Sequence, residues 1–277
     1  MKEVKCNKKQ CILSIILSIA MIITIFPIIP DNKISAVEDE IIVDNLKYKV
    51  SGGEAIVSGV DNKETLKEKV TIPDTITTSE NGNETSYTVT SIGSSAFYNC
   101  SSLTSINIPN SVTSIGRDAF ENCSGLTSIE IPEGVTSIGS SAFSSCSGLT
   151  SINIPENVKS IKSFTFSSCS SLTSIEIPAG VTSIENSAFR YCSSLESIEI
   201  PKGVKSIGDS AFSYCKGLTS INIPENVTSI EPMAFFYCSS LTSINIPENV
   251  TSIRFSAFEG CSSLTSITIP NSVTNIG

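Results

Sequence analysis

The stretch CSSLTSINIPNSVTSIGRDAFEN, residues 100–122, decides the fold of this chain, because close variants of it follow one another to residue 277. A cysteine opens each unit at an interval of 23 residues: Cys100, Cys123, Cys146, Cys169, Cys192, Cys215, Cys238 and Cys261. A proline recurs at the same interval, from Pro109 to Pro270. Self-similarity with a fixed period of about 20 to 50 residues indicates a solenoid, in which each coil packs only against its neighbours.

The apolar positions of the unit predict its strands. Ile106 and Ile108 alternate with polar residues, which is typical of a strand with one buried face, and Pro109 ends that strand. Residues 112–115 predict a second short strand. Stacked at about 4.8 Å per coil, the buried positions become continuous ladders of Ile, Phe, Val and Cys.

The rest of the unit predicts turns. Asp118 to Asn122 is interpreted as one helical turn that places Ala119 and Phe120 inward. The residue before the recurring valine of the unit is usually Gly or Asn, which tolerate positive φ, so we expect a tight turn there. These residues are Gly134, Asn157, Gly180, Gly203, Asn226 and Asn249.

The consensus string LTSIxIPxxVTSIGxxAFxxC resembles the BspA-like, treponemal-type leucine-rich repeat, also called type 5, over about residues 66–277. The resemblance implies a leucine-rich repeat solenoid of the α/β repeat class, rich in β-structure. It implies a right-handed stack of 23-residue coils with a parallel β-sheet and short helical turns. It also implies a secreted or cell-surface protein of a host-associated bacterium, since several members of the family are adhesins. The family carries no catalytic residues that could be transferred to this chain.

Residues 1–36 have the layout of a secretory signal peptide. A lysine-rich front precedes an apolar run from Cys11 to Pro30, and Ile34-Ser35-Ala36 offers small residues for cleavage. We therefore expect an extracellular protein. The alternative is an uncleaved membrane anchor, because about 20 apolar residues can span a bilayer.

The remaining chain divides into three parts. Residues 37–65 predict an N-terminal β-hairpin that caps the solenoid, and residues 66–99 an irregular first coil with a loop or hairpin inserted at residues 77–86. Residues 100–277 form the repeat solenoid, whose last unit is incomplete. Because that unit stops at Gly277 without a polar cap, we expect either a fragment of a longer protein or end-to-end self-association at the C-terminal coil.

Charge and composition exclude several kinds of function. The net charge of −9 argues against nucleic acid as a partner, because phosphates require a stripe of Lys and Arg. The absence of His removes His-dependent triads and the commonest zinc ligand. No nucleophile with a base and no phosphate loop is evident, so we expect neither an enzyme nor a cofactor.

The eight periodic cysteines allow two interpretations. Stacking would bring their Cα atoms to about 5 Å, within disulfide range, in an exported chain. However, all eight hold the same inward position, where a free Cys packs as a small hydrophobe. We favour a structural ladder of buried free thiols; a linear ladder cannot surround a metal ion tetrahedrally.

Two surfaces are candidates for ligand binding. Tyr191, Tyr214 and Tyr237 precede the cysteine in three consecutive coils, with Phe236 beside the last, and would form an aromatic contact patch. The alternative is that these rings only pack against the next coil. The second candidate lies on the outward strand positions, where Glu176 and Glu199 fall on adjacent coils near Glu196; the alternative is solvated carboxylates balanced by lysines.

Two functions from different classes therefore remain. The first is an adhesin-like interaction module that binds a host or microbial surface protein or glycan. The second is a structural or self-assembling surface protein without a specific ligand. The sequence does not name the ligand.

Overall fold

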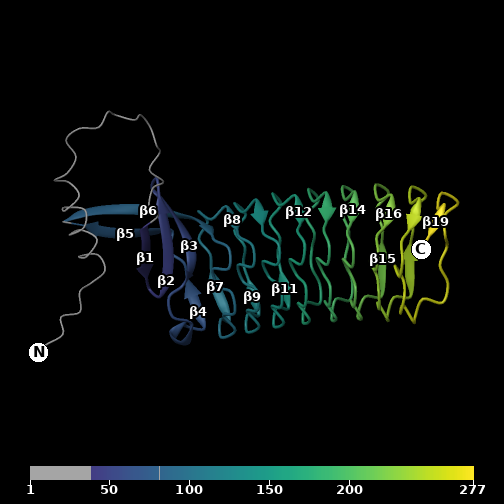
Figure 1. Cartoon of the computed structure of the whole chain (residues 1–277), viewed down its shortest axis with the longest axis horizontal. Coiled ribbons are helices and arrows are strands. Elements are labelled where there is room, and N and C mark those ends of the chain that lie inside the picture. Colours follow the sequence, from purple (N-terminus) through teal and green to yellow (C-terminus); the bar gives the residue numbers. More distant parts are fainter. Residues whose placement is uncertain (1–38, 81) are drawn as a thin grey trace, which may run out of the picture. The chain divides into compact units, whose positions relative to one another are not determined.

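A computed structural model describes residues 39–80 and 82–277 (Figure 1). The export segment predicted for residues 1–36 lies outside the described residues. No helix in the described part of the chain has the length and apolarity that a bilayer crossing requires.

The repeat folds as a β-solenoid, as predicted, with each 23-residue unit forming one coil. Two ladders of short parallel strands run along the stack, and paired residues are one repeat apart, as in Ser151↔Ser128 and Ser137↔Ser114. The first ladder contains β7 (Ser105–Asn107), β9 (Ser128–Ile129), β11 (Ser151–Ile152), β15 (Ser220–Asn222) and β17 (Ser243–Asn245). The second contains β8 (Ser114–Ile115), β10 (Ser137–Ile138), β12 (Ser160–Ile161), β13 (Ser183–Ile184), β14 (Ser206–Ile207), β16 (Ser229–Ile230), β18 (Ser252–Ile253) and β19 (Asn275–Ile276).

The core is a set of apolar ladders inside the coils. Phe97, Phe120 and Phe143 are fully buried, and the ring centroids of successive phenylalanines lie 5.2 and 5.4 Å apart with nearly parallel planes. The same stacking continues through the later coils to Phe258. Each buried Phe or Ile contributes roughly 1.5–3 kcal/mol, and a coil gains this only when its neighbour covers it.

The helical turn predicted for Asp118 to Asn122 is wrong. The equivalent segment of the next coil is a run of β-turns, in which Ala142, Ser144 and Cys146 donate backbone N–H bonds to the carbonyl three residues earlier. The intervening amides of Ser141, Phe143 and Ser145 donate instead to the next coil. A helix would direct every amide along its own axis, whereas this run uses alternate amides to join the coils.

Positive φ occurs at other positions than the sequence suggested. Gly134 and Asn157 do not have positive φ; their segments are β-turns such as Pro132–Val135, closed by a bond from Val135 N–H to the Pro132 carbonyl. The left-handed residues precede Ala and precede Cys, as at Asp118 (φ 54°) and Asn122 (φ 60°). Asn at the valine turn has a different use: its side-chain amide donates to the backbone of the previous coil.

The first coils carry an additional β-structure. β1 (Asp39–Val43), β2 (Leu46–Ser51) and β3 (Glu54–Val60) form an antiparallel meander, one strand more than the hairpin predicted for residues 37–65. β3 then pairs in parallel with β6 (Asn83–Ile92), whose end continues into the second ladder through β8. The 3-10 helix η1 (Lys63–Thr65) and β4 (Lys69–Thr71) follow β3, and β4 pairs in parallel with β7. β5 (Thr75–Glu80) and β6 form an antiparallel hairpin that contains the inserted residues 77–86.

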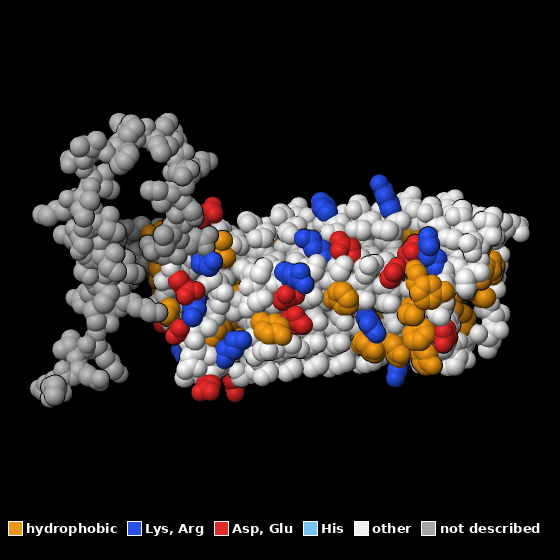
Figure 2. Space-filling model, viewed as in Figure 1, with side chains coloured by type: hydrophobic (Ala, Val, Ile, Leu, Met, Phe, Trp, Pro, Cys, Tyr) orange, Lys and Arg blue, Asp and Glu red, His pale blue; other side chains and the backbone are white. Residues whose placement is uncertain are grey.

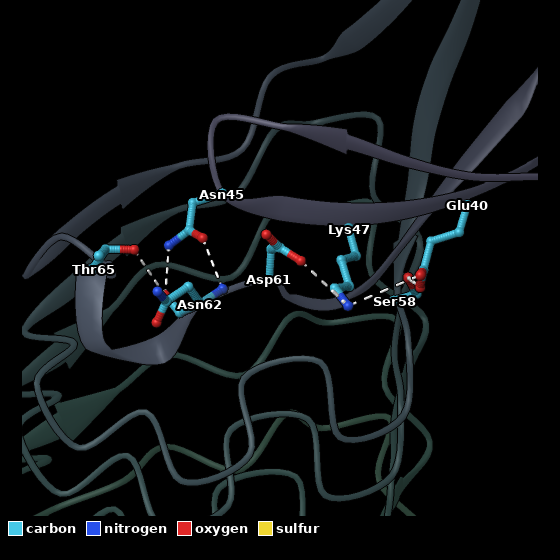
Figure 3. Close-up of polar contacts among 7 residues, drawn as sticks. All are labelled: Glu40, Asn45, Lys47, Ser58, Asp61, Asn62 and Thr65. Carbon is cyan, nitrogen blue, oxygen red and sulfur yellow. Dashed lines mark hydrogen bonds and ion pairs between the residues drawn. The ribbon is translucent and has the colours of Figure 1, made fainter. Parts of the chain in front are cut away.

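Polar side chains tie the meander to the segment that follows it (Figure 3). Asn45 donates its side-chain amide to the Asn62 carbonyl at 2.8 Å and accepts the Asn62 N–H at the same distance. Lys47 lies 3.4 Å from Asp61 and 4.0 Å from Glu40. The contacts of Asn45 and Lys47 with Asp61 and Asn62 fix the segment between β3 and η1 against the meander, and the first coil begins after this segment.

Candidate binding surface

The tyrosine strip, defined as Tyr191, Tyr214 and Tyr237, is a continuous stack on the outside of three neighbouring coils. The ring centroids of Tyr191 and Tyr214 lie 4.6 Å apart, and those of Tyr214 and Tyr237 lie 5.3 Å apart. Tyr191 and Tyr237 are 40% and 42% exposed. On the face seen in Figure 2, hydrophobic side chains gather over the later coils.

Both ends of the tyrosine strip are closed. The Arg190 guanidinium lies 4.8 Å from the Tyr191 ring centroid, and its Nη2 donates to the Tyr191 hydroxyl at 3.3 Å. At the other end, the Tyr237 ring packs against the backbone of Gly260, which has no side chain to occupy that space. The flat faces of the rings are thus covered by one another and by these neighbours. The strip presents ring edges and hydroxyl groups to a partner.

The backbone under the strip is left-handed. Tyr191, Tyr214 and Tyr237 have φ of 62°, 61° and 56° at a position where the first coils carry Asn. Asn tolerates this conformation, whereas a bulky residue there costs roughly 1–3 kcal/mol. Ring stacking offsets part of that cost, at about 0.5–1.5 kcal/mol per pair. Three consecutive tyrosines are therefore not the residues that stability alone would select.

Phe236 extends the aromatic surface sideways. Its ring meets Tyr214 edge-on, with centroids 5.5 Å apart, and lies 4.6 Å from Tyr237. Phe236 is half-buried, so it supports the neighbouring rings as well as adding apolar area. The structure thus brings together the four aromatic residues that the sequence singled out.

A shallow hollow of about 650 Å³, the serine groove, runs beside the strip over five coils. Its lining shares one property, because every side chain ends in a hydroxyl, an amide or an ammonium group. The lining residues are Asn122, Ser124, Ser145, Ser147, Ser168, Ser170, Tyr191, Ser193, Tyr214 and Lys216. None of them is acidic, in a chain whose net charge is −9.

The predicted acidic residues lie apart from this groove. Glu176 and Glu199 occupy paired positions on adjacent coils and are exposed. They line two separate hollows: Glu176 borders one of about 350 Å³, and Glu199 one of about 930 Å³ that also contains Lys202. Glu196 is exposed and lines neither. The structure therefore places the glutamates and the tyrosines on different surfaces.

All eight cysteines of the ladder are free and buried. From Cys123 to Cys261, each thiol donates to a phenylalanine carbonyl 26 residues earlier, as from Cys169 Sγ to the Phe143 oxygen at 3.1 Å. Burial raises the pKa of the Cys169 thiol well above its usual value, with the neighbouring Cys192 acting in the same direction. Each of these phenylalanine carbonyls also accepts a backbone amide within the run of turns, so the thiol adds a second bond to it. A buried thiol with a raised pKa is a poor nucleophile, so the ladder has a structural role.

Three residues of the candidate surface were not recognised from the sequence. Lys216 replaces the serine found at every other coil of its ladder position, and Arg190 lies between Ser167 and Ser213 of its own ladder. Gly260 is the one glycine among the residues that precede a ladder cysteine. Each is visible as a departure from the repeat, but its position beside the strip requires the stacked coils. In residues 39–80 and 82–277 no group of three or more His, Cys, Asp or Glu could hold a metal ion.

Comparison with solved structures gives several solenoids. A T. pallidum leucine-rich repeat protein is 28% identical, with a TM-score of 0.54 over 82% of this chain and 92% of that protein. The pneumococcal vaccine antigen PcpA is 22% identical, with a TM-score of 0.56 over 87% of this chain and 78% of that one, a likeness of fold. A leucine-rich cell surface protein of Faecalibacterium prausnitzii is 26% identical, with a TM-score of 0.48 over 86% of this chain and 84% of that one.

Comparison with curated proteins finds no match. The family described as "BspA type Leucine rich repeat region" matches residues 78–193 and 159–277, with six copies. These two segments overlap and cover the coils that carry the tyrosine strip, the serine groove and the cysteine ladder. The chain therefore belongs to the BspA type leucine-rich repeat family.

Proposed function

We propose that this chain is an extracellular binding module, which contacts a surface protein or glycan of a host or another microbe through the tyrosine strip. The observation that carries the proposal is the strip itself: three stacked tyrosines, the outer two of them exposed, at left-handed positions where the first coils use Asn. Sparsely populated backbone conformations cluster at functional sites, so bulky residues at this position support a role in ligand contact.

The physical properties of the strip suit recognition. A tyrosine has few rotatable bonds, and these rings are already fixed by their neighbours, so little conformational entropy is lost on binding. Tyrosine combines a large apolar area with a polar hydroxyl, which is why it is enriched among the residues that dominate interfaces. The surrounding coils offer small hydroxyl side chains that pack against a partner without excluding it.

Family membership and the leader predicted for residues 1–36 support an extracellular position. A net charge of −9 favours a partner other than nucleic acid. The stacked coils offer an extended surface, which suits a binding module better than an enzyme.

The test compares binding of the purified protein with that of a Tyr191→Asn, Tyr214→Asn, Tyr237→Asn triple variant on arrays of host matrix proteins and surface glycans. Asn is the residue of the first coils, so the variant avoids the strain that Ala would add at positive φ. A Glu176→Gln, Glu199→Gln double variant serves as the control on the other surface.

We expect the triple variant to keep its circular dichroism spectrum and to bind roughly thirtyfold more weakly, as for the loss of about 2 kcal/mol at an interface. The control variant should bind like the parent. Equal binding by the triple variant would contradict the proposal. Concentration-dependent assembly of the parent without ligand binding would favour the structural alternative.

A further inference from the structure

The serine groove repeats the same chemistry in successive coils. Ser145 and Ser147 of one coil are followed by Ser168 and Ser170 of the next. The coils are spaced at about 4.8 Å, so equivalent hydroxyl groups recur at that interval. A periodic row of hydroxyls matches a ligand that is itself periodic, and one linked pyranose ring is close to one coil in length.

The groove has little that an apolar peptide could use. Of its ten lining residues only Tyr191 and Tyr214 carry a large apolar surface, and none has an aliphatic side chain. Protein interfaces depend on a central apolar region from which water is excluded. Sugar hydroxyls, in contrast, both donate to and accept from serine, asparagine and tyrosine side chains.

The end of the groove at the tyrosine strip is positively charged. Lys216 is exposed and lines the groove, and Arg190 lies against Tyr191. Neither cation forms an ion pair with an acidic residue in the part of the chain that the structure describes. Arg190 Nε is buried without a hydrogen-bond partner. The nearest acids of the Arg190 ladder, Glu121 and Glu259, lie three coils before it and three coils after it.

The stacking of the tyrosines decides how a ligand would meet them. Because the ring faces cover one another, a sugar cannot stack flat on Tyr214 between its neighbours. It would instead contact ring edges and phenol hydroxyls, while Lys216 bonds an acidic substituent. A charged group on the ligand is therefore worth more here than an additional apolar face.

From these observations we propose that the serine groove binds an acidic oligosaccharide, which lies along the coils with a carboxylate or sulfate at Lys216 and Arg190. This inference rests on the proposed function and specifies its ligand. The serine row sets the register of the sugar rings, and the two cations set which end of the groove takes the charge.

The test is isothermal titration of the purified protein with a hyaluronan hexasaccharide and a heparin hexasaccharide. N-acetylchitohexaose provides the neutral counterpart, and a hexaglutamate peptide provides negative charge without sugar rings. We expect at least one acidic hexasaccharide to bind at least tenfold more tightly than chitohexaose or hexaglutamate, with an affinity that falls as salt is added.

Lys216→Gln should weaken that binding about tenfold, whereas Lys202→Gln, which removes the same charge from another hollow, should leave it unchanged. Equal binding of chitohexaose, preference for hexaglutamate, or no binding of either acidic hexasaccharide would each overturn the inference. So would a Lys216→Gln variant with the affinity of the parent. If the triple tyrosine variant still lost its surface ligand in those cases, the proposed function would stand without this inference.

Discussion

The ring of Tyr237 occupies the space that a side chain at Gly260 would need. A Cβ placed on Gly260 would lie 2.6 Å from Tyr237 Cδ2, and the φ of Gly260 is +76°. Gly260 holds the position before Cys261 that tyrosine holds in the three coils before it. Because it has no side chain, the ring of Tyr237 packs directly on its backbone. The strip stops here because the next coil has no side chain to continue it.

Replacing Gly260 should consequently damage both the coil and the strip. We expect Gly260→Ala to lower the free energy of unfolding by roughly 1–3 kcal/mol, because Ala is strained at this φ and collides with the Tyr237 ring. Urea unfolding measures the loss. Gly134→Ala is the matched control, since its Cβ would meet the nearest atom at 3.4 Å and its φ is not left-handed; it should change stability little.

The cysteine ladder predicts a marked sensitivity to alkali. Burial raises the pKa of the ladder thiols in the folded protein, whereas in the unfolded chain they ionise at about pH 8.5. Unfolding then releases protons above that pH, so the contribution of the thiols to stability is constant below it and falls as the pH rises. The loss approaches about 1.4 kcal/mol per pH unit for each thiol.

Urea unfolding between neutral pH and pH 10 measures this dependence. Cys192→Ala should make the decline less steep by the share of one thiol, although it also costs some stability at neutral pH through the lost bond to the Phe166 carbonyl. A transition midpoint that stays level up to pH 10 would show that the thiols are not buried as protonated groups.

The asparagines of the valine turn should stabilise contacts between coils. Asn249 Nδ2 donates to the Glu225 carbonyl of the previous coil at 2.7 Å. Asn249→Gly should therefore cost about 1 kcal/mol. The reverse change, Gly134→Asn, should increase stability by a few tenths to about 1 kcal/mol, because the Asn110 carbonyl lies near the added side chain. Opposite shifts in thermal unfolding temperature would support this role, and shifts of the same sign would refute it.

The phenylalanine stack should be the part of the core most sensitive to truncation. Phe166 is fully buried between Phe143 and Phe189, with centroid distances of 5.7 and 5.5 Å. We expect Phe166→Ala to cost roughly 3–5 kcal/mol. Phe164, two residues away, is 43% exposed, and Phe164→Ala should cost far less. Equal losses of unfolding free energy for Phe166→Ala and Phe164→Ala would contradict the assignment of Phe166 to the core and Phe164 to the surface.

Much of the fold could be predicted because the repeat indicates which residues face inward. Phe120 and Ile106 recur at one spacing, and a position that stays apolar in every coil has to be buried. The second strand was predicted too long, since pairing is limited to Ser114–Ile115 in that coil. The aromatic patch was also recognisable, as tyrosine replaces a small polar residue in three successive units.

The rest depends on bonds between coils, which no single unit contains. Whether the segment around Ala142 becomes a helix or a run of turns depends on where its amides donate, and half of them donate to the next coil. The positive φ at Asn122 follows from that run, and the Gly and Asn residues before valine have no part in it. Likewise, Arg190 and Gly260 matter only because stacking brings them to the ends of the tyrosine strip.

The most direct test of the account is hydroxyl-radical footprinting of the protein, free and bound to the ligand that the array experiment selects. The account predicts that Tyr191, Tyr214 and Tyr237 are oxidised in the free protein, since two of them are about 40% exposed, and become protected on binding. Phe97 and Phe120, which are buried in both states, serve as internal references. Protection confined to the surface of Glu176 and Glu199, with the three tyrosines oxidised as before, would contradict the central claim.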